Sequence, residues 1–296
     1  MVKPVISAGA LHELIRQSAA YPASAALRVI DCSWHMPAAN RSGRKEFEQI
    51  RIPGAQFFDI DAVTSKSPYP HMLPSAEQFA QHAGSALGVN NKTHVVVYDS
   101  QGIFSAPRVW MTFRTFGHEN VSVLNGGLVA WKQANLPLET TKPASVTPSQ
   151  FIAKLSPNLM RDFPFVDKLV RDKQVSKDNG LQIVDARSSP RFQGTVPEPR
   201  PGLAGGHMPG SRNIPFTDLL DPKTQCLLSD DELRQVFARA NVDPLRPLVA
   251  SCGSGVTACV IALAAFQLGN KSAAVYDGSW TEYASQPGAL IECAKK

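Results

Sequence analysis

Short apolar runs alternate with longer helical patterns along this chain. The runs HVVVYD (residues 94–99) and LVAS (248–251) are short, apolar and bounded by turn formers, which is typical of buried strands. The segments SAPRVWMTFRTFG (105–117) and GVTACVIALAAFQLG (255–269) have helical patterns, and each closes on a glycine, the usual residue beyond a helix C-terminus. Strand and helix in alternation predict an α/β fold with a parallel sheet flanked by helices on both faces.

The same landmarks occur twice, at an offset of about 150 residues. RVIDCSW in the first half corresponds to QIVDARS in the second, and HVVVYDSQG corresponds to PLVASCGSG. A constant offset of this length indicates a duplicated domain rather than a short solenoid repeat. We therefore expect an amino-terminal domain over residues 1–138, a linker over 139–164 and a carboxy-terminal domain over 165–296.

Composition limits the classes of function that the chain can have. Its 296 residues suffice for two domains, and 43% hydrophobic with 19% charged residues is ordinary for a soluble protein. The net charge of +5 is modest and its lysines and arginines are scattered, so we expect no nucleic-acid partner. The amino terminus lacks the pattern of a secretory signal, and no apolar run reaches the roughly 18 residues of a membrane span. We expect a soluble intracellular protein with no membrane partner.

The cysteines predict free thiols. There are five of them, Cys32, Cys226, Cys252, Cys259 and Cys293. An odd number spread over a long chain argues against a disulfide framework and for a reducing compartment. No CxxC occurs and the histidines are dispersed, so we expect no metal site.

Cys252 lies at a predicted junction of strand and helix, where parallel sheets bind their ligands. The loop from Gly253 to Thr257, with Gly255 and Val256 inside it, can turn its backbone N–H groups toward one spot. The first turn of the next helix adds donors and its positive dipole end. A thiolate held there is stabilised and nucleophilic. A buried structural cysteine is the alternative, which we favour less because the first copy has Asp99 at this place.

This loop and the motifs PGA, NIPF and YDGSW are similar to those of the rhodanese-family sulfurtransferases, and the resemblance covers nearly the whole chain. The resemblance implies two tandem rhodanese-like domains. The amino-terminal copy would be inactive, with Asp99 in the cysteine position, and the carboxy-terminal copy catalytic through Cys252 without a cofactor. The loop CGSGVT is similar to that of the branch that takes 3-mercaptopyruvate as sulfur donor. The thiosulfate branch has an arginine and a lysine after the cysteine, which suit a dianion.

Two arginines match those with which the mercaptopyruvate branch holds its substrate. They are Arg191 and Arg200 in SSPRFQGTVPEPRPG. A guanidinium offers forked donors that a carboxylate and a neighbouring keto oxygen can accept together. A solvated surface charge is the ordinary alternative for an arginine in a loop rich in proline and glycine. The resemblance favours the substrate role, and it adds the loop residues Gly253, Gly255, Val256 and Thr257 to the substrate-binding set.

Three further residues match a Ser-His-Asp arrangement that has been proposed for this branch. They are Ser254, His71 and Asp61, and the implied role is a proton relay beside the thiol. The segment between Asp61 and His71 is one residue shorter than the usual family pattern. The alternative for His71 is a loop histidine beside Pro70.

The implied reaction is a double displacement through a Cys252 persulfide, with pyruvate released and a thiol such as thioredoxin, or cyanide, as acceptor. We expect a monomer in the cytoplasm, and the family also occurs in mitochondria.

The main alternative is a thiosulfate:cyanide sulfurtransferase. A phosphatase of this fold needs an arginine six positions after the cysteine, where Ala258 stands. A non-catalytic module is disfavoured because the nucleophile and both arginines are kept. Cys259 is predicted to be a core residue two turns along the same helix.

Overall fold

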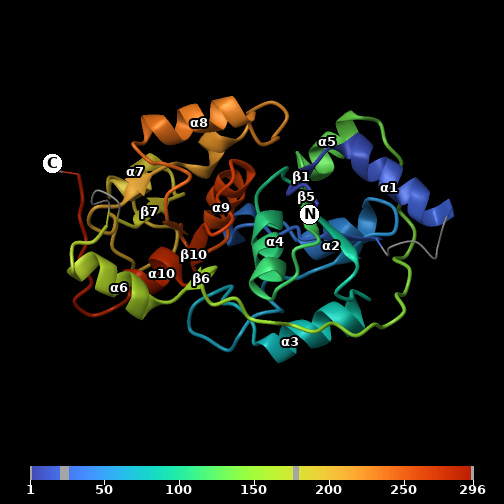
Figure 1. Ribbon diagram of the computed structural model, residues 1–296, viewed down its shortest axis with the longest axis horizontal. Helices are drawn as coiled ribbons and strands as arrows, with labels where there is room; N and C mark the ends of the chain where they lie inside the picture. The colour runs from blue at the N-terminus through green and yellow to red at the C-terminus, as the bar shows by residue number, and fades with distance from the viewer. Residues whose placement is uncertain (1, 21–26, 176–179, 295–296) are drawn as a thin grey trace. The chain divides into compact units, whose positions relative to one another are not determined.

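The computed structural model describes residues 2–20, 27–175 and 180–294. The chain divides into two compact units, coloured from blue to green and from yellow to red for most of their length in Figure 1. The first comprises Met1–Ser65, Leu73–Ser156 and Asp221–Leu227, and the second comprises Lys66–Met72, Pro157–Leu220 and Leu228–Lys296. Two short segments are thus grouped with the unit formed mainly by the other half of the sequence.

The sheet of the first unit is parallel throughout, in the order β1-β5-β4-β2-β3. Its strands are β1 (Val5–Ile6), β2 (Leu27–Asp31), β3 (Gln56–Phe57), β4 (His94–Tyr98) and β5 (Val121–Leu124). The central strand β4 is buried from Val95 to Tyr98. A strand covered on both faces is apolar at successive positions rather than alternating, which is why HVVVY could be recognised in the sequence.

Helices cover both faces of this sheet (Figure 1). On one face lie α1 (Ala8–Ala20), α2 (Gly43–Gln49) and α5 (Gly127–Gln133), whose buried side chains share one apolar cluster with β2 and β4. On the other lie α3 (Ala76–Gln81), which continues into a π-helical turn η2 (His82–Ala86), and α4 (Ala106–Thr115). A short 3-10 turn, η1 (Pro37–Ala39), precedes α2.

The second unit repeats this topology, with the parallel order β6-β10-β9-β7-β8. Its strands are β6 (Met160–Arg161), β7 (Gln182–Asp185), β8 (Arg212–Asn213), β9 (Leu248–Ser251) and β10 (Ala274–Tyr276). Its helices are α6 (Phe163–Arg171), α7 (Ser189–Phe192), α8 (Asp230–Arg239), α9 (Ala258–Gln267) and α10 (Ser279–Tyr283), with a 3-10 turn η3 (Phe216–Leu219). The equal strand orders confirm the predicted duplication.

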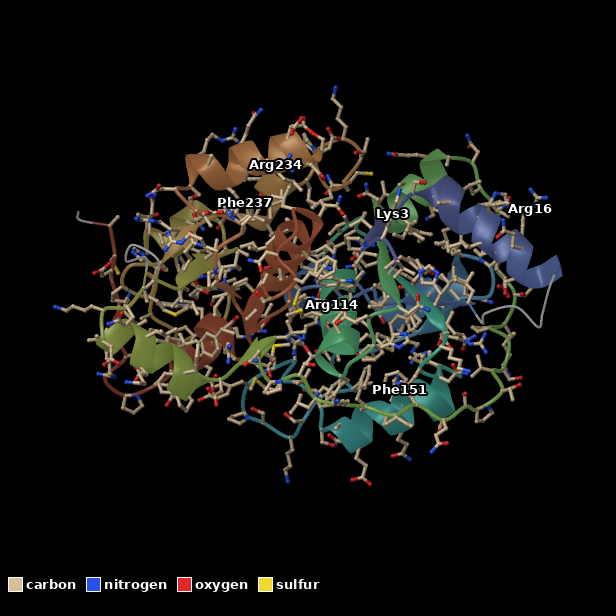
Figure 2. All side chains as sticks on the ribbon, viewed as in Figure 1. Lys3, Arg16, Arg114, Phe151, Arg234 and Phe237 are labelled. Carbon is tan, nitrogen blue, oxygen red and sulfur yellow. The ribbon has the colours of Figure 1, made fainter. Side chains whose placement is uncertain are left out.

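Helices again lie on both faces (Figure 1). Side chains of α6 and α10 share one apolar cluster with β7, β9 and β10. On the other side of the strands lie α8 and α9. On α8, Phe237 is fully buried whereas the side chain of Arg234 is 56% exposed, and Figure 2 labels both. The α/β prediction is therefore confirmed for each unit.

The two helices predicted in detail are confirmed, with one correction. α4 and α9 are followed by Gly117 and Gly269, both with positive φ. However, α9 begins only at Ala258, so residues 252–257 form an irregular loop. Cys259 lies in the first turn of α9, not two turns along it. It is fully buried, as predicted, and its thiol donates to the carbonyl of Gly255 at 3.3 Å.

The segment predicted as a linker lies along ordered structure. Glu139 exchanges backbone hydrogen bonds with Arg51, and the Ser156 N–H donates to the carbonyl of Thr115. Phe151, labelled in Figure 2, is 5% exposed among aromatic rings that include Phe79. From residue 160 the chain forms β6 and then α6. The sequence showed proline and polar residues here, and it did not show these contacts.

All five cysteines are free thiols, as predicted. Cys32, Cys252 and Cys259 are buried, Cys226 is partly buried and Cys293 is exposed. Among the helices that the structure describes, none combines the length and the apolar character that crossing a membrane requires.

One buried carboxyl gives the first unit a pH-sensitive point. Asp31 ends β2 with only 1% of its surface exposed, and it accepts bonds from the Ser33 N–H at 2.8 Å and hydroxyl at 2.5 Å. Burial outweighs these bonds and raises the pKa of Asp31 from 3.8 to about 7. Between about pH 4 and pH 7, the folded state therefore keeps a proton on Asp31 that the unfolded state has already released.

We predict that Asp31→Asn changes the pH dependence of stability. As the pH rises from about 4 to about 7, the wild type should lose stability relative to the variant, by an amount on the order of a few kcal/mol. Denaturant unfolding of both proteins at several pH values measures the difference, in which the other titrating groups cancel. Parallel stability curves would contradict the raised pKa.

Candidate active site

The first turn of α10 holds the backbone around Cys252. The Cys252 N–H donates to the hydroxyl of Ser279 at 3.1 Å, and its carbonyl accepts the Trp280 N–H at 3.0 Å. The carbonyl of Gly253 accepts the Thr281 N–H at 2.9 Å. α10 thus bonds two successive residues of the loop and supports its shape. Cys252 is only 2% exposed at the carboxyl end of β9.

Ser279 adopts an unusual backbone conformation to make this contact. It has φ of 50° although it is not glycine, and it is fully buried. Its hydroxyl donates to the Tyr276 carbonyl at 2.8 Å while accepting from Cys252. A left-handed serine costs backbone energy that the surrounding contacts must offset, and such residues cluster at functional sites.

The first unit shows what such a loop can hold. There the residue after β4 is Asp99, which is fully buried. Its carboxylate accepts the N–H groups of Gln101, Phe104, Ser105 and Ala106 at 2.8–3.0 Å. The backbone at this end of the strand therefore offers four N–H donors to one acidic side chain. In the second unit Cys252 occupies the place of Asp99, which supports the proposal that its loop cradles a thiolate.

His71 and Ser254 lie together in the second unit. The Nδ1 atom of His71 is 3.1 Å from the hydroxyl oxygen of Ser254, two residues after Cys252. Both side chains are buried, and His71 has a left-handed φ of 61°. The segment Lys66–Met72 belongs to this unit, and the Tyr69 hydroxyl accepts a bond from Gln286 at 2.8 Å. His71 is therefore a buried histidine held by its contact with Ser254 rather than a free loop histidine.

Asp61, the third member of the predicted relay, belongs to the first unit. There its carboxylate accepts a hydrogen bond from the indole N–H of Trp34 at 2.9 Å. Its part in the relay stays a prediction.

A buried chain of charges supports the loop that carries the arginines. Arg187 bonds to both oxygens of Asp185, and its Nη1 donates to Glu198 at 2.9 Å. Glu198 also accepts from Arg191, at 2.5 Å and 3.1 Å. Burial by itself would lower the pKa of Arg187, but the two carboxylates outweigh it and raise that pKa. Four alternating charges thus neutralise one another.

Aromatic stacking fixes this chain to α10. The guanidinium of Arg187 lies 4.2 Å from the centre of a Trp280 ring, a cation–π contact. The Trp280 indole donates to the carbonyl of Ala204 at 2.9 Å. Trp280 therefore connects three parts of the site, since its backbone N–H also bonds to Cys252.

Both predicted substrate arginines lie near Gly253, Arg191 directly and Arg200 through Thr281. A Cβ atom placed on Gly253 would lie 3.2 Å from Nη2 of Arg191, so a larger residue would require that guanidinium to shift by a few tenths of an ångström. Nη1 of Arg200 donates to the Thr281 hydroxyl at 3.4 Å, and this hydroxyl donates to the Gly253 carbonyl at 2.6 Å. The cations of the site therefore stand beside the cysteine loop rather than on it.

Sequence reasoning assigned no role to three residues of this site. Glu198 holds Arg191, Ser279 receives the Cys252 N–H, and Thr281 contacts Arg200. A usable signal existed for Glu198, an acid flanked by prolines in the run PEPR that lies between Arg191 and Arg200 in the sequence. YDGSW is a recognisable motif, but no local pattern predicts that its serine and the following threonine face the cysteine.

The site offers a thiol, a hydroxyl, an imidazole, guanidiniums and backbone N–H groups. Among the residues that the structure describes, no group of three or more His, Cys, Asp or Glu side chains is placed to hold a metal ion. The arrangement is suited to nucleophilic attack by a thiolate on an anionic substrate.

Comparison with known proteins gives matches over almost the whole chain. A family model described as a rhodanese-like domain matches residues 13–134 and 169–286. Human 3-mercaptopyruvate sulfurtransferase is 45% identical over 286 residues, 96% of this chain and 92% of the human protein. A mitochondrial thiosulfate/3-mercaptopyruvate sulfurtransferase of Arabidopsis thaliana is 40% identical over 98% of this chain and 78% of its own length.

A solved structure agrees with these matches. The crystal structure of a 3-mercaptopyruvate sulfurtransferase from Escherichia coli superposes with a TM-score of 0.78 at 36% identity, covering 94% of this chain and 99% of the other. The relatives' names include both mercaptopyruvate and thiosulfate as donors, so the choice of donor has to come from the site itself.

We predict that Glu198→Gln destabilises the protein by about 3 kcal/mol, because it removes one charge from a buried network and leaves the arginines undercompensated. Denaturant unfolding measures this change. The control is Asp231→Asn, which breaks an exposed ion pair with Arg234. The side chain of Arg234 is 56% exposed and that of Asp231 is 89% exposed. That variant should lose less than about 1 kcal/mol. Equal losses in the two variants would contradict the role of Glu198.

Proposed function

Because this chain belongs to the rhodanese-like family, we propose that it is a 3-mercaptopyruvate sulfurtransferase that works through a persulfide on Cys252. One observation carries the choice of donor. Arg191 lies beside the glycine next to the nucleophile and Arg200 is linked to it through Thr281, while residues 253–257 of the loop carry no charge. A donor whose sulfur is neutral and whose carboxylate lies at its far end suits this arrangement better than thiosulfate, whose charge lies at the reacting group.

In the first half-reaction the Cys252 thiolate attacks the sulfur of 3-mercaptopyruvate. The carbon–sulfur bond breaks, and its electron pair stays on carbon as the enolate of pyruvate. The proton leaves the transferred sulfur and ends on the methyl carbon of pyruvate, so the enzyme is left with an anionic persulfide. The arginines hold the carboxylate and the keto oxygen, where negative charge grows as the enolate forms.

His71 and Ser254 are placed to move that proton. The hydroxyl of Ser254 lies two residues from Cys252 and within hydrogen-bond distance of His71. A hydroxyl can accept one proton while donating another, and an imidazole can hold a proton near neutral pH. We assign them the transfer from sulfur to carbon, with Asp61 as the proposed orienting group.

In the second half-reaction an acceptor thiolate attacks the outer sulfur. The sulfur–sulfur bond breaks, Cys252 leaves as a thiolate, and the acceptor becomes a persulfide. A second thiol of the acceptor then releases hydrosulfide and closes a disulfide, so a dithiol protein such as reduced thioredoxin fits the chemistry. Cyanide takes the same sulfur and leaves as thiocyanate. We propose that the enzyme works as a monomer in the cytoplasm, and the mitochondrial Arabidopsis relative supports a second location.

The test of the proposed function is the persulfide itself. After treatment with 3-mercaptopyruvate and no acceptor, intact mass and peptide mapping should show one added sulfur atom on Cys252, with one pyruvate released for each enzyme. Addition of cyanide should remove the added sulfur. Cys252→Ser should show neither product, and Cys259→Ser serves as a matched control in the same unit. Sulfur transfer that persists in Cys252→Ser would contradict the proposal.

A further inference from the structure

We propose that Thr281 is a positioning residue that holds the Arg200 guanidinium beside the cysteine loop and so favours a donor that carries a carboxylate. This inference rests on the function proposed above, because it concerns how the same site binds that donor.

Thr281 is 8% exposed, in the first turn of α10. Its hydroxyl donates to the carbonyl of Gly253 at 2.6 Å and accepts from Nη1 of Arg200 at 3.4 Å. A hydroxyl has one hydrogen to donate and two lone pairs to accept with, so both bonds form at once. The resulting chain runs from Arg200 through Thr281 to the residue that follows the nucleophile.

The contacts of Thr281 divide between its backbone and its side chain. Its backbone N–H already bonds to the Gly253 carbonyl at 2.9 Å. Removing only the hydroxyl therefore leaves the cysteine loop attached to α10 through this bond and through the bonds of Ser279 and Trp280. The hydroxyl adds a second bond to the Gly253 carbonyl and the link to Arg200, so its loss should act mainly on substrate binding rather than on the thiol.

The two substrate arginines are held in different ways. Arg191 is held by the carboxylate of Glu198, which offsets part of its charge. The Thr281 hydroxyl, a neutral acceptor, gives the guanidinium of Arg200 a hydrogen bond. An arginine side chain loses rotamer entropy when it is fixed, and a guanidinium that is already oriented loses less of it when the donor binds.

The test uses the isosteric variant Thr281→Val in the full-length protein. The KM for 3-mercaptopyruvate should rise about 2- to 10-fold, as expected for one net hydrogen bond, with kcat changed less than about twofold. For thiosulfate with cyanide as acceptor, kcat/KM should stay within about twofold. Thr281→Ser keeps the hydroxyl and should restore the KM. Thr217→Val, which removes an exposed hydroxyl of the same unit, should match the wild type.

A double-mutant cycle decides whether Thr281 acts through Arg200. Arg200→Ala alone should raise the KM for 3-mercaptopyruvate, and adding Thr281→Val should raise it no further. An equal rise in both backgrounds, an equal effect on thiosulfate, or no rescue by serine would overturn the role of Thr281 while leaving the proposed function in place. A wild-type protein that uses thiosulfate and not 3-mercaptopyruvate would overturn both.

Discussion

Backbone N–H groups that converge on Asp99 at the carboxyl end of a buried strand set the main constraint on the first unit, and we propose the same arrangement for the loop around Cys252. Such donors are costly to bury without an acceptor, and together they favour a negative charge. In the first unit the carboxylate of Asp99 accepts four of these N–H groups. In the second unit the same place is taken by Cys252, whose charge we propose to be a thiolate before sulfur transfer and a persulfide after it. The contacts of Asp99 in the first unit thus indicate what the equivalent loop in the second unit can bind.

Keeping the cysteine loop in shape requires support from elsewhere in the second unit. The first turn of α10 bonds to Cys252 and Gly253, and Trp280 carries that support to Arg187 and its carboxylate partners. Arg191 therefore belongs to a buried and nearly neutral network, while Arg200 bonds to Thr281 of α10. In the proposed mechanism the loop stabilises charge on sulfur while the arginines bind charge at the far end of the donor.

The sequence predicted the elements whose pattern is local, and it missed the contacts made by residues far apart. HVVVY and the patterns that ended at Gly117 and Gly269 could be assigned because burial on both faces and glycine caps leave a local signature. The start of α9 was predicted too early because glycine, serine and valine do not mark the end of an irregular loop. Ser279, Thr281 and the grouping of His71 with the second unit depend on contacts between distant segments, which no local pattern encodes.

The measurement that tests the central claim most directly is kcat/KM for 3-mercaptopyruvate and for thiosulfate, with cyanide as the common acceptor. If arginines beside a neutral loop select the donor, 3-mercaptopyruvate should be preferred at least about tenfold, or roughly 1.4 kcal/mol in the transition state. A preference for thiosulfate would contradict this account of the donor and would leave the fold and the nucleophile unchanged.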